Sequence, residues 1–312
     1  MTTTSAPLPN QLPNSGIRSI SYPSFGEATG RDYAEEYYSR FPTVERNLFS
    51  RRHHARYAVG LVGVGSEVRL PEVDRLRTVL TMPDLDTAVS QLRFDSYSRL
   101  GWIDTPPDAN NGESDAHDAV SLRFGVVANT VFGAKMVSCS RLILGELGYS
   151  LPVENDYPDL FAKKPTADRA TEISRMISMR PMDPHEIASK IWKQSPVKGE
   201  PRMVYAALQR VMIGVGRAAG YTCAYVMAEE RLIKGLKALK VPFQQMTDYC
   251  PIPEYGNTKN AVIFVSPGDV EQRTRITNMR IPLQTRLFFR GIETNHGQGC
   301  YYDNNMIFRR PG

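Results

Sequence analysis

Cysteine, histidine and tryptophan are scarce in this chain of 312 residues, which has four, five and two of them. The cysteines are isolated at Cys139, Cys223, Cys250 and Cys300, and no Cys-x-x-Cys pair occurs. The sequence therefore indicates neither a disulfide framework nor a zinc site, and we expect no metal and no tightly bound cofactor. No apolar run approaches the roughly 20 residues that cross a bilayer, and no secretory signal pattern opens the chain. These absences predict a soluble protein without a membrane span, cytoplasmic by default.

Signatures of nucleic-acid binding are also missing. The formal net charge is +5, yet neither an RNA-binding strand motif nor a zinc finger accompanies it, so a nucleic-acid partner is not expected. Lysines and arginines gather between Lys190 and Lys240. This basic face could dock an acidic protein or could simply be a solvated helix face, and the sequence leaves both readings open.

The composition divides the chain into four parts. Residues 1–30 are rich in Thr, Ser, Pro and Asn, which predicts a disordered N-terminal segment. Residues 31–84 form an N-terminal extension packed on the core, in which 31–52 has the spacing of two short helices. Residues 85–266 carry the main domain. Residues 267–312 form a C-terminal extension without a motif that we can interpret.

Hydrophobic periodicity predicts alternating strands and helices in the main domain. The loop at 104–112 has the composition of a mobile lid, and 145–168 reads as irregular because of its prolines. This order predicts an α/β protein with a mixed central sheet and helices on both faces, a three-layer αβα arrangement. We expect helices at 71–80, 84–100, 184–192, 201–219 and 229–239, and strands at 57–64, 119–127, 133–144, 171–179, 221–227 and 259–265.

Charged residues recur inside segments that read as core. Arg93 and Tyr97 share a face of the 84–100 helix. Each charged residue alone also fits a solvated or loop-capping role, but buried charges are unfavourable unless paired, so their density together indicates a site. Along the 171–179 strand, simple alternation places Glu172 and Arg175 on opposite faces. The other members are Glu113, Asp115, Asp118 and Arg141.

Taken in order, these residues resemble the motifs of the acyl-homoserine-lactone synthases, the LuxI-type autoinducer synthases of the GNAT acyltransferase superfamily. The elements are an Arg, an aromatic residue and Leu-Gly-Trp at 93–102, then Glu-x-Asp-x-x-Asp at 113–118. Arg141-Leu142 and Glu-x-Ser-Arg at 172–175 complete the series. The resemblance spans residues 85–266 and implies a GNAT-like fold, with N- and C-terminal extensions outside it.

The resemblance also implies residue roles. Arg93, Tyr97 and Trp102 would line the pocket of the amino donor S-adenosylmethionine. Glu113, Asp115 and Asp118 would bind substrate there, and the two aspartates would pair with Arg141 and Arg175 in a buried charge network. Glu172 would act as the base for the attacking amine, with Arg175 and Arg141 completing the catalytic set.

The implied reaction transfers an acyl group from acyl carrier protein or acyl-CoA to S-adenosylmethionine, which yields a quorum-sensing lactone. The acyl carrier protein is a possible partner for the basic face. A carboxylate on a strand is a reasonable general base for such chemistry. The acyl chain length and the choice between the two donors stay open.

Three departures from the family pattern keep alternatives open. Tyr97 stands where the family prefers Phe, the segment from Arg93 to Trp102 is one residue short, and Thr171 replaces the usual Trp before the glutamate. Glu-Ile-Ser-Arg also occurs in N-acyl amino acid synthases, which use a free amino acid. A non-catalytic GNAT-like binding protein is the third reading.

Overall fold

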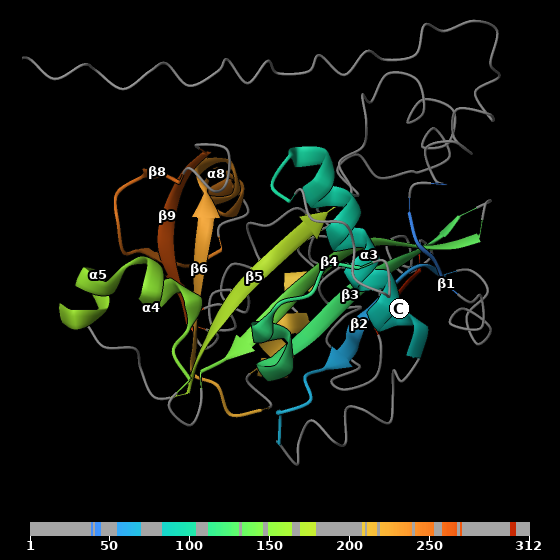
Figure 1. The fold of residues 1–312 in the computed structure, drawn as a ribbon, viewed down its shortest axis with the longest axis horizontal. Helices are drawn as coiled ribbons and strands as arrows, with labels where there is room; N and C mark the ends of the chain where they lie inside the picture. Colours follow the sequence, from blue (N-terminus) through green and yellow to red (C-terminus); the bar gives the residue numbers. More distant parts are fainter. Residues whose placement is uncertain are drawn as a thin grey trace, which may run out of the picture.

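The computed structural model describes most of the main domain and parts of both flanking regions (Figure 1). Among the predicted elements, the helices at 71–80 and 184–192, the loop at 104–111 and the segment 1–38 lie outside the described residues. The described residues are 39, 41–44, 55–69, 83–103, 112–130, 133–145, 149–163, 169–178, 208–209, 211–216, 219–238, 241–252, 258–266, 269 and 300–303.

One mixed sheet organises the protein. Its central path runs in the order β10-β2-β3-β4-β5-β6-β9-β7, with β1 paired to β4 and β8 paired to β9. All recorded pairings are antiparallel except the parallel one between β5 and β6. The strands are β1 (Thr43–Val44), β2 (Ala55–Val64), β3 (Ser121–Thr130), β4 (Gly133–Leu144), β5 (Ala170–Ser178), β6 (Cys223–Glu229), β7 (Gln244–Gln245), β8 (Cys250–Ile252), β9 (Thr258–Val265) and β10 (Cys300–Asp303).

Helices cover both faces of this sheet. Helix α3 (Pro83–Leu100) crosses β2, β3 and β4, and the short helices α4 (Pro152–Asp156) and α5 (Pro158–Lys163) lie on the same face at a distance from it, near β6 (Figure 1). Helix α8 (Glu230–Ala238) and the helical residues 208, 209 and 211–216, called the Leu208 helix below, pack on the other face. The predicted mixed α/β sheet with helices on both faces is thus confirmed.

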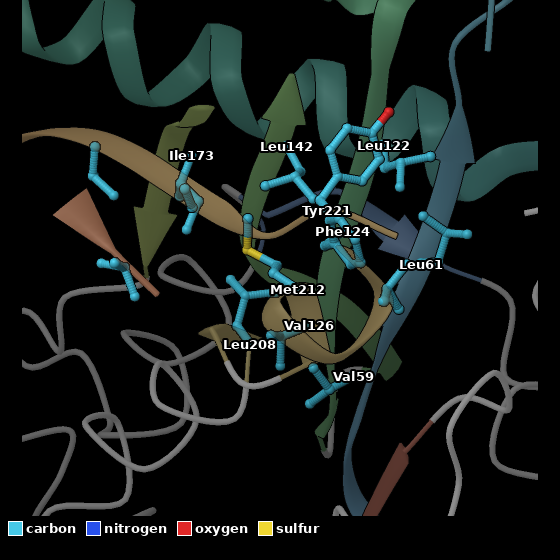
Figure 2. Close-up of a cluster of buried hydrophobic side chains, with 14 of the residues drawn as sticks. Val59, Leu61, Leu122, Phe124, Val126, Leu142, Ile173, Leu208, Met212 and Tyr221 are labelled. Carbon is cyan, nitrogen blue, oxygen red and sulfur yellow. The ribbon is translucent and has the colours of Figure 1, made fainter. Parts of the chain in front are cut away.

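Alternation along the strands assigns the core to two sides. Leu142 and Leu144 of β4 join the large apolar cluster under the Leu208 helix, whereas Ile143 between them joins the smaller cluster with Val153 of α4. Figure 2 shows Leu142 and Ile173 pointing toward Met212 of the Leu208 helix. Every residue of β4 is buried because helices and turns cover both faces of this central strand, and its buried polar residues include Lys135 and Arg141.

Several predicted boundaries change. The stretch 145–168 contains α4 and α5 instead of being wholly irregular, because Pro152 and Pro158 stand at the first positions of helices, where a missing N–H does no harm. Within 31–52, Thr43–Val44 is a strand and not part of a helix, since it pairs with Ala134 and Lys135. Strands β2 and β10, from the two predicted extensions, belong to the central sheet.

Gly220 ends the Leu208 helix region as predicted. Its φ of 86° lies in the left-handed region, and the Tyr221 N–H donates to the Gly216 carbonyl at 2.9 Å. Only glycine takes such a φ without strain, so this position closes the helix and turns the chain into β6.

Candidate active site

Helix α3 delivers two side chains to the sheet one turn apart. Arg93 is 1% exposed and Tyr97 5% exposed, so both lie under the helix as the spacing predicts. The same helix holds the next part of the site, because the Glu113 N–H donates to the Ser90 carbonyl at 3.0 Å. The chain leaving α3 is therefore tied back onto it before the acidic motif begins.

The acidic motif forms a 3-10 turn, η2 (Ala116–Val120), with Asp115 as its N-cap. The Asp115 carboxylate accepts the His117 N–H at 2.9 Å, and the Asp118 carboxylate accepts the Asp115 N–H at 3.0 Å. This reciprocal capping satisfies backbone donors at the start of the turn. It also fixes both aspartates in one orientation, toward the sheet.

Three arginines meet three carboxylates beneath α3. Arg93 contacts Asp118 at 2.8 Å and forms an ion pair with Glu113. Arg141 contacts Asp118 at 3.0 Å and pairs with Asp115. The pairing expected between the aspartates and Arg141 is thus present.

Arg175 is the third arginine of this group and contacts two of the carboxylates. It lies 3.2 Å from Glu113 and 3.1 Å from Asp115, so each of the three carboxylates contacts at least two arginines. Formal charges cancel within this set, the condition under which buried ions are tolerated. We call these six residues the charge network.

Contacts within the charge network lower the pKa values of its two aspartates. Burial alone would raise the pKa of Asp115, but its hydrogen bond and attraction to Arg141, with Arg175 and Arg93 nearby, hold that pKa well below its usual range. The pKa of Asp118 is lowered for the same reason, chiefly by Arg93 against the effect of burial. Both aspartates are therefore ionised at neutral pH.

An aromatic wall stands beside the charge network. The rings of Tyr97 and Trp102 stack with centroids 5.4 Å apart and an interplanar angle of 24°. The Arg175 guanidinium lies 5.2 Å from the centre of the Tyr97 ring, within the range of a cation–π contact. Tyr97 thus links the ion pairs to Trp102.

A β-bulge redirects Arg175. Cys139 pairs with Ile177 and Arg141 pairs with Ser174, so three steps along β5 oppose two along β4. Arg175 sits in this bulge with a φ of 52°. The extra residue breaks the alternation. Arg175 therefore reaches the α3 face together with Glu172, and our prediction of opposite faces is wrong.

Beyond the bulge the alternation is inverted. Met176, predicted on the Glu172 side, packs with the large apolar cluster and receives a hydrogen bond from Gln209 Nε2 to its Sδ at 3.3 Å. Ile177, predicted on the side away from Glu172, is the register partner of Cys139 on β4.

Glu172 is a buried carboxylate separate from the charge network. It is 3% exposed, and its Oε2 accepts the Val153 N–H of α4 at 2.7 Å. Burial raises the pKa of Glu172 to about 7, against the lowering effect of that hydrogen bond. A carboxylate with such a pKa can both take and return a proton near neutral pH.

Glu172 lies where two strands separate. In the described chain, β5 and β6 are paired from Ala170–Cys223 to Glu172–Tyr225, although both strands continue. Figure 1 shows them diverging from this point. On the opposite face from Glu172, a small apolar cavity is lined by residues such as Leu142, Ile173 and Met212. The junction thus places a titratable carboxylate on one side and an apolar cavity on the other.

The sequence reasoning missed one charged pair. Arg123 of β3 binds Asp86 of α3 with Nε–Oδ1 and Nη2–Oδ2 distances of 2.5 and 2.6 Å. Its signal was a lone arginine inside an apolar strand, directly opposite Arg141 in the sheet register. Cross-strand neighbours on one face are close, so this position adjoins the charge network.

No group of three or more histidine, cysteine, aspartate or glutamate side chains among the described residues could hold a metal ion. Among the helices that the structure describes, none is long and apolar enough to span a bilayer. Most of the predicted basic face from Lys190 to Lys240 lies outside the described residues, but Arg231, Lys234 and Lys237 are exposed on α8.

Known proteins match this chain by structure but not by sequence. The sequence matches no protein-family model, and a search of curated proteins finds no match. The structure is similar to that of the AHL synthase LasI, at 14% identity over 68% of this chain and 91% of that one, with a TM-score of 0.45.

Two further solved structures are similar to this chain. One is the CoA-dependent acyl-homoserine lactone synthase BjaI with SAM and isopentyl-CoA, at 12% identity over 71% and 89% of the two chains, with a TM-score of 0.46. The other is FeeM, an N-acyl amino acid synthase from uncultured soil microbes, at 11% identity over 73% and 99%, with a TM-score of 0.39.

Proposed function

We propose that this protein is an acyltransferase that moves an acyl group from a thioester to an amine, with Glu172 as the general base. The observation that carries the proposal is the buried Glu172 carboxylate, with a pKa of about 7, at the point where β5 and β6 separate. Amine attack requires loss of a proton, and a base works best when its pKa lies near the operating pH. Such a base contributes about 10²–10⁴-fold to the rate.

The charge network and the aromatic wall support an amine pocket on the α3 face. The buried Nε–H of Arg175 has no acceptor within the described residues, so it is an unused hydrogen-bond donor at the edge of the charge network. Tyr97 and Trp102 offer ring faces that suit a flat or cationic group. By the motif resemblance, we propose S-adenosylmethionine as the amine donor, so that the product is an acyl-homoserine lactone.

The thioester fits the other side of the same junction. Ile173, Leu142 and Met212 line the apolar cavity, and Met176 packs beside them. Unbranched, polarisable methionines adapt to flexible apolar groups. We propose that the acyl chain lies on this side, with its carbonyl near Glu172, and that either acyl-CoA or acyl carrier protein supplies it. Exposed Arg231, Lys234 and Lys237 of α8 would suit the acidic carrier protein.

A second candidate is an N-acyl amino acid synthase of the same chemistry. Thr171, which precedes Glu172 where a lactone synthase usually has Trp, is buried and donates to the Cys223 carbonyl at 3.0 Å. A small residue bonded across β5 and β6 changes the shape of the junction. This departure favours a changed substrate pocket while it leaves Glu172 in place.

The test offers the purified protein acyl-CoA and acyl-carrier-protein donors with S-adenosylmethionine or single amino acids, and mass spectrometry identifies the products. Acyl-homoserine lactone together with methylthioadenosine supports the first candidate, and N-acyl amino acid without methylthioadenosine supports the second. Failure to form either product across the donor panel contradicts both and favours a binding protein.

A matched pair of variants tests the base. Glu154 also accepts a backbone N–H at 2.7 Å, from Leu151, but it belongs to α4 outside the proposed site. We expect Glu172→Gln to lower kcat by about 10²–10⁴-fold and Glu154→Gln to leave it within about threefold. Equal effects in the two variants would remove Glu172 from the mechanism.

A further inference from the structure

Arg123 uses three of its nitrogen atoms to join two elements. Nε and Nη2 bind both carboxylate oxygens of Asp86 on α3, as a two-pronged ion pair. Nη1 donates to the backbone carbonyl of Asp118 at 3.0 Å. The Arg123 side chain is 12% exposed and that of Asp86 is 39% exposed, so the arginine end of this connection is shielded from water while the aspartate end faces it. It joins α3 to the turn η2 through a strand that lies beneath both.

The backbone makes room for this connection at Gly63. Gly63 of β2 lies opposite Arg123 in the sheet register. A Cβ atom at Gly63 would lie 2.6 Å from Asp86 Oδ1 and 2.8 Å from Arg123 Nε. Any other residue would push the pair apart, so the bidentate geometry depends on the absence of a side chain here.

Asp118 is consequently held through both its side-chain carboxylate and its main-chain carbonyl. Its carboxylate binds Arg93 at 2.8 Å and Arg141 at 3.0 Å. Its carbonyl accepts Arg123 Nη1 and the Ser121 hydroxyl at 3.2 Å. Contacts of the carboxylate fix only a side chain, which can rotate about its own bonds. Hydrogen bonds to the main-chain carbonyl fix the path of the chain itself. Arg123 therefore constrains where the turn places both Asp115 and Asp118.

Asp86 anchors the arginine to the helix that carries Arg93. The two residues are seven apart, which is close to two helical turns, so they lie on one face of α3. The helix thus contacts the turn directly, through Arg93, and indirectly, through Asp86 and Arg123. Two attachments seven residues apart oppose rotation of the turn relative to the helix, which a single attachment cannot do.

We propose that Arg123, anchored by Asp86, is a positioning residue that fixes the turn η2 and so sets the placement of Asp115 and Asp118 in the amine pocket. Arg123 acts through the Asp118 carbonyl and does not itself touch substrate. The role in catalysis rests on the proposed function, while the role in holding the turn does not. A misplacement of about 1 Å in such a site lowers rates by up to about a hundredfold.

The experiment compares Arg123→Met, Arg123→Lys and Asp86→Asn in the full-length chain, with Arg69→Met as a matched control. Arg69 is exposed and donates to the Ser66 carbonyl at 2.5 Å, so this variant removes an arginine-to-carbonyl bond outside the charge network. Hydrogen–deuterium exchange is followed in peptides covering residues 113–121, with β9 as an internal reference. Steady-state kinetics gives kcat and KM separately for amine and thioester.

We expect exchange in 113–121 to become about tenfold faster in Arg123→Met and to stay unchanged in β9 and in Arg69→Met. The KM for the amine should rise about tenfold or more while the KM for the thioester stays constant. Arg123→Lys, which keeps the charge and one donor nitrogen, should recover part of this loss. A general loss of folded protein would lower kcat and leave both KM values alone.

Unchanged exchange in 113–121, or equal changes in the two KM values, would overturn the proposal. If Arg123→Met does not fold, Asp86→Asn decides, since it frees the arginine from its anchor and keeps the Asp118 contact available. If the wild-type protein transfers no acyl group, the proposed function fails, but the exchange measurement still determines whether Arg123 holds the turn.

Discussion

Strand β4 contributes Arg141 to one face of the sheet and Leu142 to the other, and the surroundings of these two residues are held together by different forces. On the α3 face, the three arginines and three carboxylates of the charge network contact one another at specified distances. On the face of the Leu208 helix, Leu142, Ile173 and Met212 are in apolar contact. Ion pairs need defined partners, whereas apolar packing needs mainly volume.

This difference indicates why the proposed chemistry lies on the α3 face. An apolar cluster accommodates substitutions of similar size, so it can adjust to an acyl chain without loss of the fold. The charge network cannot adjust in that way, since removal of one member leaves another buried charge unpaired. The same sheet thus combines an adaptable apolar cluster on one face with a rigid charge network on the other, and Glu172 lies on the face of the charge network.

The largest effect should follow from Arg141→Met, because the substitution leaves Asp115 and Asp118 short of a partner. We expect the free energy of unfolding to fall by about 3–5 kcal/mol, measured by urea denaturation at neutral pH. The neighbouring control, Leu142→Met, should lower it by less than about 1.5 kcal/mol. Similar losses in the two variants would show that the faces do not differ in tolerance.

Acid should bring the stability penalties of these two variants closer together. Since the pKa values of Asp115 and Asp118 are lowered in the folded protein, their ion pairs stabilise it above the ordinary aspartate pKa of 3.8, and this contribution is lost as the pH falls below that value. The penalty of Arg141→Met should therefore shrink at low pH, and that of Leu142→Met should not.

Leu142→Ala should have the next effect, a loss of about 2–4 kcal/mol from the cavity that it leaves beneath the Leu208 helix. We expect this loss to be independent of pH, because no titratable group changes its environment. Denaturation curves at two pH values measure it. A loss that varies with pH as strongly as that of Arg141→Met would mean that the two faces are coupled through β4.

Glu172 should give a pH dependence of opposite sign to that of the aspartates. Burial raises its pKa from 4.5 to about 7, so the folded protein keeps this proton where the unfolded chain releases it. The resulting stability is present below pH 4.5 and is lost as the pH rises through about 7.

Glu172→Gln should remove that loss, so the stability difference between wild type and variant should change by roughly 3 kcal/mol over this range. Thermal unfolding of both proteins at several pH values measures the difference. A constant difference would show that Glu172 titrates normally and would weaken its assignment as the base.

The smallest effect concerns two glycines. Gly63→Ala should destabilise the protein by about 1–2 kcal/mol, because the new Cβ displaces the Asp86–Arg123 pair. Gly235→Ala on α8 is the matched control, since a Cβ there meets nothing within 4 Å. In a helix that change should be neutral or stabilising by up to about 1 kcal/mol. Melting temperatures compare the two, and a stabilised Gly63→Ala would show that the pair adapts.

Much of the fold could be predicted from hydrophobic pattern. The helix at 84–100, the strands at 57–64 and 133–144, and the turn at Gly220 correspond to observed elements, because each is determined by residues close in sequence. The short strand Thr43–Val44 and the helices after Pro152 and Pro158 were not predicted. Two residues give no periodicity, and proline marks a helix start as readily as a break.

The residues of the charge network were found by type and order, but their geometry was not. Acids and arginines inside apolar segments must be paired, and this requirement follows from sequence alone. Which arginine meets which carboxylate depends on sheet register. Arg123 was overlooked for this reason, since its partners Asp86 and Asp118 lie 37 and 5 residues away and nothing local connects the three.

The sequence by itself determined that the chain forms a mixed sheet with helices on both faces and that it buries charges in pairs, because both follow from periodicity and from the unfavourable free energy of an unpaired buried ion. Only the tertiary structure decided that Arg175 joins Glu172 on one face. That outcome depends on a single extra residue in β5 relative to β4, with Arg175 at a φ of 52°, and a bulge is set by pairing between strands and leaves no mark on the alternation of either strand alone.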